Sequence, residues 1–204
     1  MSKKVMNVSE FDRVASLISA AGDVITSKQV TNAGIHRSVL SDMVGNNELV
    51  RIGRGVYMRP TSWEDEMYLL QYRYGKGIFS HETALYLHGM SDRIPARFTM
   101  TFPWGYNAAS LGGGDVTVKR TIRELHDLGV TEIKSPGGNQ IRAYDIERTL
   151  CDIVRGAGIR DVSIINQAMK RYVARSGKNI HRLLGYAEKL RVESKILNYM
   201  EVLL

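Results

Sequence analysis
The segment that most constrains the fold is ELVRIGRGVYMRP, residues 48–60. Two short apolar runs flank a Gly-Arg-Gly turn, and this pattern predicts a β-hairpin. Arg54 stands at the tip of that hairpin between two glycines, with Arg51 before it and Arg59 after it. A guanidinium on a tight, glycine-flanked turn can approach a phosphate closely, so the segments before the hairpin decide what kind of domain carries it.

Three short helices are predicted ahead of the hairpin. Residues 7–21 place apolar side chains at a 3.6-residue period, and Asn7 with Glu10 gives a capping-box start. In TSKQVTNAG, Thr26 with Gln29 predicts a second capping box and a helix of about two turns. The third predicted helix is IHRSVLSDMVGNN, whose apolar positions leave a small, polar outer face.

The order helix, short helix, helix, hairpin is that of a winged helix-turn-helix domain, in which the hairpin is the wing. A recognition helix enters a major groove about 12 Å wide and reaches base edges with its N-terminal residues. We therefore expect base contacts from His36, Arg37, Ser38 and Ser41. We expect phosphate contacts from Lys28, Arg51, Arg54 and Arg59. The alternative is a protein-interaction module whose arginines are simply solvated.

The pattern changes after Pro60, so we divide the chain into a winged helix-turn-helix domain, 1–60, and a C-terminal domain, 61–204. Strands are predicted at ARFTMTFP and DVTVKRT, and a hairpin at TEIKSPGGNQIRAYD. From Ile146 onward the sequence indicates helices at 146–155, 160–175, 178–190 and 193–203. The fold class is therefore α+β, with the winged helix-turn-helix followed by a mixed α/β domain that ends in helices.

Charge is unevenly distributed along the 204 residues, whose net charge is +7. Residues 1–60 hold 8 basic and 5 acidic residues, residues 61–147 hold 9 and 11, and residues 148–195 hold 11 and 4. A basic bias of this kind favours polyanionic partners.

The last of these regions forms a predicted second basic patch, which is made of Arg155, Lys170, Arg171, Arg175, Lys178 and Arg182. Two interpretations stay open for the patch: a further contact with DNA or RNA, or a solvated helix face that covers its own core.

No catalytic motif is present. His81 and Glu82 would begin a zinc-protease helix, but that motif needs a second histidine where Leu85 stands. Cys151 lies between apolar neighbours and is expected to be a buried structural thiol. Three acids in and next to the predicted helix at 146–155, Asp145, Glu147 and Asp152, suit either a metal-dependent nuclease or an ordinary acidic helix start. We expect no enzyme, catalytic residue, metal or cofactor.

The location expected from the sequence is the cytoplasm. A single cysteine cannot form an internal disulfide, which fits a reducing compartment. The N-terminus has no apolar stretch of the kind found in signal peptides. No run of 18 or more apolar residues is present, so no membrane-spanning helix is expected.

Three blocks carry a resemblance to a known family. They are SLISAAGDVITSKQVTNAGIHRSVLSDMVGNNELVRIGRGVYMRP, IFSHETALYLHGMSDRIPARFTMTFP and AYDIERTLCDIVR. In this order they resemble the AbiEi family, the antitoxins of type IV abortive-infection toxin–antitoxin systems that act in phage defence. The resemblance covers nearly the whole chain.

The resemblance implies a bacterial repressor of its own operon that binds inverted repeats in promoter DNA. It also implies a neighbouring nucleotidyltransferase-like toxin, which the C-terminal domain counteracts without forming a stable complex. The family supplies no catalytic residue to carry over. We expect a chain that is monomeric in solution or cooperative on DNA. The alternative is a C-terminal domain that acts as an enzyme or as an RNA-binding module on the toxin's substrate.

Overall fold

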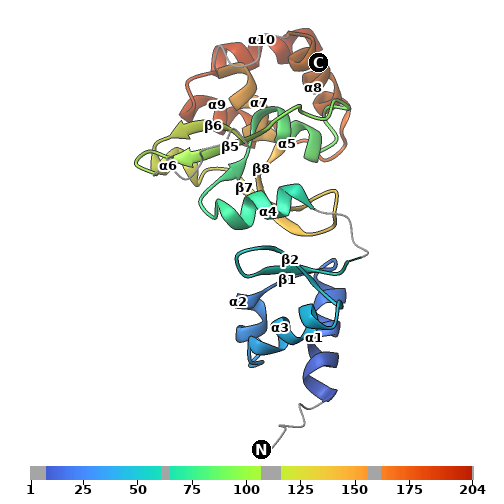
Figure 1. The fold of residues 1–204 in the computed structure, drawn as a ribbon. Coiled ribbons are helices and arrows are strands. Elements are labelled where there is room, and N and C mark those ends of the chain that lie inside the picture. The colour runs from blue at the N-terminus through green and yellow to red at the C-terminus, as the bar shows by residue number, and fades with distance from the viewer. Residues whose placement is uncertain (1–7, 61–64, 107–115, 156–161, 204) are drawn as a thin grey trace, which may run out of the picture. The chain divides into compact units, whose positions relative to one another are not determined.

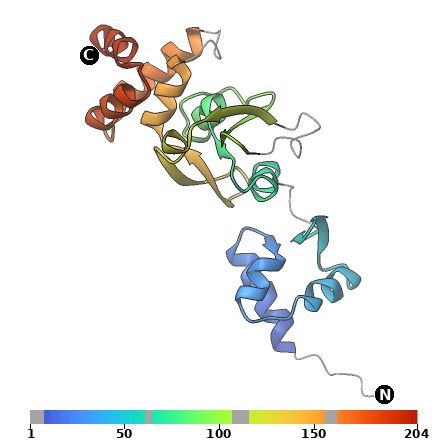
Figure 2. The same cartoon turned by 90° about the vertical axis from the view of Figure 1, so that its left-hand side faces the viewer.

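The computed structural model describes residues 8–60, 65–106, 116–155 and 162–203, which form two compact units (Figures 1 and 2). The first unit comprises residues up to Leu69 together with Ser135–Asn139, and the second comprises Leu70–Lys134 and Gln140–Leu204. The predicted capping residue Asn7 lies outside the described residues. Helices and sheets occur in both halves of the chain, and the α+β class is confirmed.

The first unit follows the predicted order of elements, with one added strand. Its elements are α1 Val8–Ala20, β1 Val24–Thr26, α2 Ser27–Asn32, α3 Ser38–Gly45, β2 Val50–Gly53 and β3 Val56–Met58. The strand β1 was not predicted, and it pairs antiparallel with β3 to give a three-stranded sheet in the order β1-β3-β2. The helices pack on one another through fully buried apolar residues that include Val14, Ile18, Val30, Leu40 and Leu49.

The second unit is built on a five-stranded mixed sheet. Its strands are β4 Ile78–Phe79, β5 Phe98–Pro103, β6 Val116–Thr121, β7 Val130–Lys134 and β8 Gln140–Tyr144, in the order β6-β5-β4-β8-β7. The two-residue strand β4 lies at the centre, antiparallel to β5 and parallel to β8. The outer pairs are β5 with β6, which is parallel, and β7 with β8, which is antiparallel.

Helices surround this sheet and continue beyond it. They are α5 His81–Leu87, α6 Arg123–His126, α7 Ile146–Arg155, α8 Val162–Ala174, α9 Ile180–Lys189 and α10 Glu193–Leu203, while α4 Glu66–Arg73 spans the division between the units. Figures 1 and 2 show α8, α9 and α10 gathered beside α7. One apolar core joins these helices to α5 through fully buried residues such as Leu85, Leu150, Met169, Leu183 and Ile196. Among the described helices, none is long and apolar enough to cross a bilayer.

An arginine lies inside this unit. Arg148 on α7 is 1% exposed, and its Nε donates to Asp152 Oδ1 over 3.1 Å. Its Nη1 donates to the backbone carbonyls of Leu125 and Leu128, and its guanidinium lies 4.2 Å from the centre of the Tyr144 ring. The side chain therefore connects α7 to α6 and to the segment between α6 and β7. Burial raises the pKa of Asp152, against the opposing effect of the arginine.

Candidate nucleic-acid interface
The first helix of the helix-turn-helix pair begins at the predicted capping box. Thr26 Oγ1 accepts a hydrogen bond from the backbone N–H of Gln29 over 3.1 Å, and the Thr26 N–H donates to Gln29 Oε1 over 2.8 Å. This reciprocal pair satisfies two backbone donors that the start of a helix leaves without partners. It fixes the start of α2, and with it the position of the exposed Lys28 one residue further on.

The turn between α2 and α3 depends on one glycine. Gly34 has a φ of +71°, a left-handed conformation that a residue with a side chain rarely adopts. The next residue, Ile35, points back into the core, and its N–H donates to the Val30 carbonyl over 3.1 Å. The buried Ile35 and its hydrogen bond thus hold the short turn that joins α2 to α3.

The second helix of the pair starts later than predicted. We expected it to include residues 35–37, but α3 begins at Ser38, and Arg37 occupies the preceding cap position. His36 takes over a capping role, because the Ser38 N–H donates to its Nδ1 over 3.3 Å and the Ser38 hydroxyl lies 2.8 Å from the same nitrogen. The predicted helix boundary was therefore wrong, since a side-chain cap replaces the first helical turn at this point.

The outer face of α3 is small and polar. Ser38 and Ser41, three residues apart on the helix, are exposed, and the exposed Arg37 lies directly before them. Val39, Leu40 and Met43 face the core on the other side. The side chains at the start of α3 are therefore free to enter a groove without disturbing the core. The exposed candidates here are His36, Arg37, Ser38 and Ser41.

The wing is a two-strand hairpin closed by Arg54 and Gly55. Gly53 pairs with Val56 across it, and Gly55 has a φ of +73°. Arg54 is exposed at the tip. Arg51 on β2 is also exposed, and its Nε donates to the Gly53 carbonyl over 3.2 Å.

The wing tip is held against the start of α2. The Ser27 N–H donates to the Gly55 carbonyl over 2.9 Å, and Thr26 pairs with Val56 where β1 runs beside β3. Arg54 and Lys28 therefore lie at the same end of the unit, next to the residues that the hydrogen bond joins. Because β1 was not predicted, this contact was not predicted either. The one signal for the strand is the β-branched run Val24–Thr26.

Arg59 does not lie with the other candidates. It follows β3, at the opposite end of the hairpin from the tip, and its Nε lies 3.4 Å from Asp23 Oδ1. Its Nη2 donates to Ser19 Oγ over 2.9 Å and to the Ala15 carbonyl over 3.4 Å. These contacts fasten the end of β3 to α1, so we withdraw Arg59 from the predicted phosphate contacts.

The predicted second basic patch is not one cationic surface. Arg171 on α8 forms a two-pronged ion pair with Asp92, and this pairing lowers the pKa of that carboxyl. Arg182 on α9 lies 3.8 Å from Asp145 Oδ2 and 3.9 Å from Glu147 Oε2. Lys178 donates to the Arg175 carbonyl over 3.2 Å.

The three remaining cations of the patch are exposed: Arg155 ends α7, Lys170 lies on α8, and Arg175 follows that helix.

Each of the carboxylates considered for a nuclease has structural partners within the fold. Asp145 accepts hydrogen bonds from the Tyr186 hydroxyl over 3.1 Å and from the Arg148 N–H over 2.8 Å. Glu147 accepts from the Tyr172 hydroxyl over 3.2 Å, and Asp152 is paired with the buried Arg148. In the described part of the chain, no group of three or more acidic, histidine or cysteine side chains is arranged to hold a metal.

The histidine and the cysteine noted in the sequence are enclosed by the fold. His81 has a left-handed φ of +52°, and burial, followed by the nearby Lys119, lowers its pKa to about 4. Cys151 is fully buried, and burial raises the pKa of its thiol to about 12. A neutral thiol of this kind is a poor nucleophile, which agrees with the structural role that the sequence predicted.

Comparison with known proteins connects these features to a family. Residues 12–60 match the family described as "Transcriptional regulator, AbiEi antitoxin". No curated protein matches the chain. The crystal structure of the RV2827C protein from Mycobacterium tuberculosis is similar in fold, with a TM-score of 0.53 at 17% identity over 96% of this chain and 80% of that one.

The matched segment runs from within α1 through the helix-turn-helix pair and the wing to Pro60. It contains the capping box, the exposed start of α3 and the hairpin tip. Residues 12–60 are therefore similar to the antitoxin-type transcriptional regulators of the AbiEi family, as the sequence indicated.

Proposed function
We propose that this chain represses its own operon by binding inverted repeats in promoter DNA and, as an antitoxin, counteracts a nucleotidyltransferase-like toxin. One observation carries the DNA-binding part. The hydrogen bond from Ser27 to Gly55 brings the wing tip to the start of α2, so that Arg54 and Lys28 share one end of the unit. Such a pair of cations suits two phosphates that flank a groove.

Within this proposal the candidate residues have different roles. Arg37 reaches base edges, since a guanidinium can donate two hydrogen bonds to guanine in the major groove. Ser38 and Ser41 contact bases or the sugar-phosphate backbone beside it. Lys28, Arg51 and Arg54 contact phosphates and so contribute affinity without sequence preference.

We assign DNA binding to residues 1–60 and neutralisation of the toxin to residues 61–204, without a stable complex between the two proteins. A promoter-binding role places the chain in the bacterial cytoplasm. The internal partners of Asp145, Glu147 and Asp152 support a C-terminal domain that is not an enzyme. The exposed cations Arg155, Lys170 and Arg175 keep an RNA-binding role as the second candidate.

The test is a mobility-shift titration of DNA from immediately upstream of the gene against scrambled DNA of equal length, at several salt concentrations. Sequence-selective shifts in two steps would support a repressor that occupies two repeats. If each chain neutralises about three phosphates, the logarithm of the affinity should fall against the logarithm of the salt concentration with a slope of about −2.7. Equal affinity for both DNAs would contradict the proposal.

The role of the C-terminal domain is tested separately by co-expressing the toxin with the full chain or with an Arg37→Ala variant that no longer selects its operator. Neutralisation that survives loss of selective DNA binding would support a direct antitoxin role for residues 61–204. Neutralisation that disappears with it would mean that repression alone controls the toxin.

A further inference from the structure

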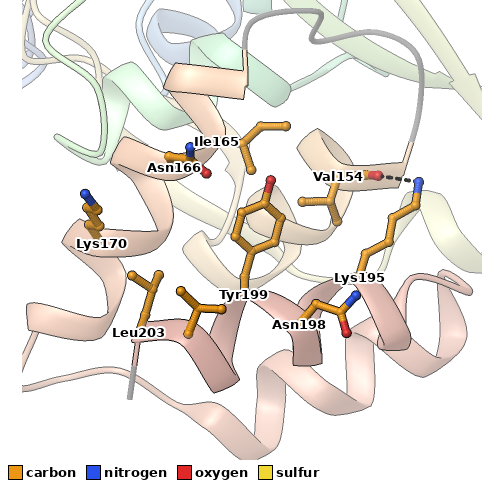
Figure 3. Close-up of a pocket in the computed structure, with 9 residues that line it drawn as sticks. Val154, Ile165, Asn166, Lys170, Lys195, Asn198, Tyr199 and Leu203 are labelled. Atoms are coloured by element: carbon orange, nitrogen blue, oxygen red, sulfur yellow. Dashed lines mark hydrogen bonds between the residues drawn. The ribbon is translucent and has the colours of Figure 1, made fainter.

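The helical end of the second unit contains a hollow that the proposed function does not use. It has a volume of about 590 Å³ and lies between α8, α10 and the end of α7 (Figure 3). Hollows of this size accommodate small molecules. Its described lining is Val154, Ile165, Asn166, Lys170, Lys195, Asn198, Tyr199, Val202 and Leu203.

The floor and walls of the hollow are mostly apolar. Val154 and Ile165 face the ring of Tyr199 across it, as Figure 3 shows. Val202 is 84% exposed, the largest exposed fraction among the large apolar side chains of the described residues. Apolar side chains that face solvent around a concave surface commonly mark a binding site, so the body of a suitable ligand is aromatic or aliphatic.

The rim of the hollow is basic. Lys170 and Lys195 lie on opposite sides of Tyr199 in Figure 3, and the amides of Asn166 and Asn198 lie between them. The Lys195 Nζ donates to the Val154 carbonyl over 3.1 Å, which holds its ammonium at the rim. None of the described residues that line the hollow is acidic. A negatively charged group on a ligand would best complement the lysines and amides of this rim.

We propose that the hollow binds a small amphipathic anion, a molecule with an aromatic or acyl body and a carboxylate, sulfonate or phosphate head. The body lies on Tyr199 and Ile165, and the head lies between a lysine ammonium and an asparagine amide. A double-stranded nucleic acid does not fit this description, because its phosphates lie on a convex surface without an apolar group to fill the floor.

The experiment is a fluorescence titration of the full chain with anilinonaphthalene sulfonate, an aromatic sulfonate whose emission rises in apolar surroundings. We expect saturable binding at one site. Octanoate should displace the probe, whereas octanamide, which has the same chain without the charge, should not displace it at the same concentration. Equal displacement by the two would overturn the anionic part of the proposal.

Two pairs of variants locate the site. Val202→Glu places a negative charge in the wall, and Leu197→Glu places one on the same helix at a side chain that is 38% exposed and does not line the hollow. Lys170→Glu changes the rim, and Lys189→Glu makes the same change at an exposed position on α9. The first member of each pair should weaken probe binding about tenfold or more, and the second should leave it within about twofold.

Several outcomes would overturn the proposal: no saturable emission with the folded chain, or an equal loss of binding in both members of a pair. Thermal unfolding of each variant checks that it is folded, and all four positions lie at the surface. The titration contains no DNA, so its failure leaves the proposed promoter binding untouched, and failure of promoter binding leaves this proposal untouched.

Discussion
Cations serve different purposes in the two units. In the winged-helix unit, Lys28 and Arg54 are exposed at one end, beside a hydrogen bond that positions them. In the second unit, Arg171 and Arg182 lie against carboxylates, and Arg148 is buried with one.

Carboxylates from elsewhere in the chain explain why the predicted basic patch does not form one cationic surface. The basic segment, 148–195, receives Asp92, Asp145 and Glu147 from the acidic segment before it. The excess charge of one segment is therefore partly neutralised by the other within the fold. The role of a cation therefore depends on whether a carboxylate lies against it in the fold. The number of cations in a stretch of sequence does not determine that role.

The largest effect that would test this contrast between paired and exposed cations is a loss of stability on replacing Arg148. Arg148→Ala removes the partner of a buried carboxylate and leaves two backbone carbonyls without their donor. We expect the free energy of unfolding to fall by about 3–5 kcal/mol, measured by urea denaturation followed by circular dichroism.

Arg182→Ala is the matched control, because its ion pairs belong to a side chain that is 49% exposed. It should lower the free energy of unfolding by less than about 1 kcal/mol. If the two variants are equally stable, Arg148 is not the internal connection described above.

The next effect concerns sequence preference. Arg37→Ala should reduce discrimination between operator and scrambled DNA by about 1–3 kcal/mol, since base contacts carry specificity. Competition binding at fixed salt measures this difference. Arg175→Ala, an exposed arginine of the second unit, is the control and should preserve discrimination. Loss of affinity for both DNAs to the same extent would mean that Arg37 contacts a phosphate.

A smaller effect is expected at the capping box. Thr26→Ala removes the hydroxyl that accepts from the Gln29 N–H and should lower the stability of the winged-helix unit by about 1 kcal/mol. Ser27→Ala, one residue later, retains the backbone N–H that binds Gly55 and should change stability little. Thermal unfolding of both variants tests the difference. Equal transition temperatures would mean that the capping box does not stabilise α2.

Within the winged-helix unit, Arg54 and Arg59 should differ in how they respond to salt. Arg54→Ala should weaken binding to all sequences a fewfold and make the salt slope shallower by about 0.9. Arg59→Ala should leave the slope unchanged, because this side chain is bound to Asp23 and Ser19. A shallower slope for Arg59→Ala would mean that this arginine does contact a phosphate.

The smallest effect at neutral pH is expected for His81, whose pKa is lowered to about 4 from the ordinary 6.5. The unfolded chain then binds this proton more readily than the folded chain, so the free energy of unfolding should fall as the pH drops from 6.5 toward 4. His81→Asn, which tolerates a positive φ, should reduce this dependence.

Local sequence signals predicted much of the fold. Helices α7 and α10 have the predicted bounds, and Thr26 and Gln29 form the predicted capping box, because caps and periodicity act within a few residues. Strands β1 and β4 were missed, since each is only two or three residues long and exists through pairing with distant strands.

The candidate site was predicted less completely for the same reason. The sequence showed that Lys28 and Arg54 are polar positions on a helix and a turn, but their placement together depends on β1 pairing with β3. Arg59 was misplaced because its partners, Asp23 and Ser19, lie about forty residues away in the chain. A motif of cations gives no sign of whether a carboxylate from elsewhere will meet it.

The hydrogen bond between Ser27 and Gly55 also has a kinetic consequence. A wing tip that is already fastened to the body of its unit needs no ordering during an encounter with DNA. Association should then be governed by diffusion and charge steering, and operators of different quality should differ mainly in how long the complex persists. A DNA-binding protein of this design would begin to occupy its sites as soon as its concentration rises.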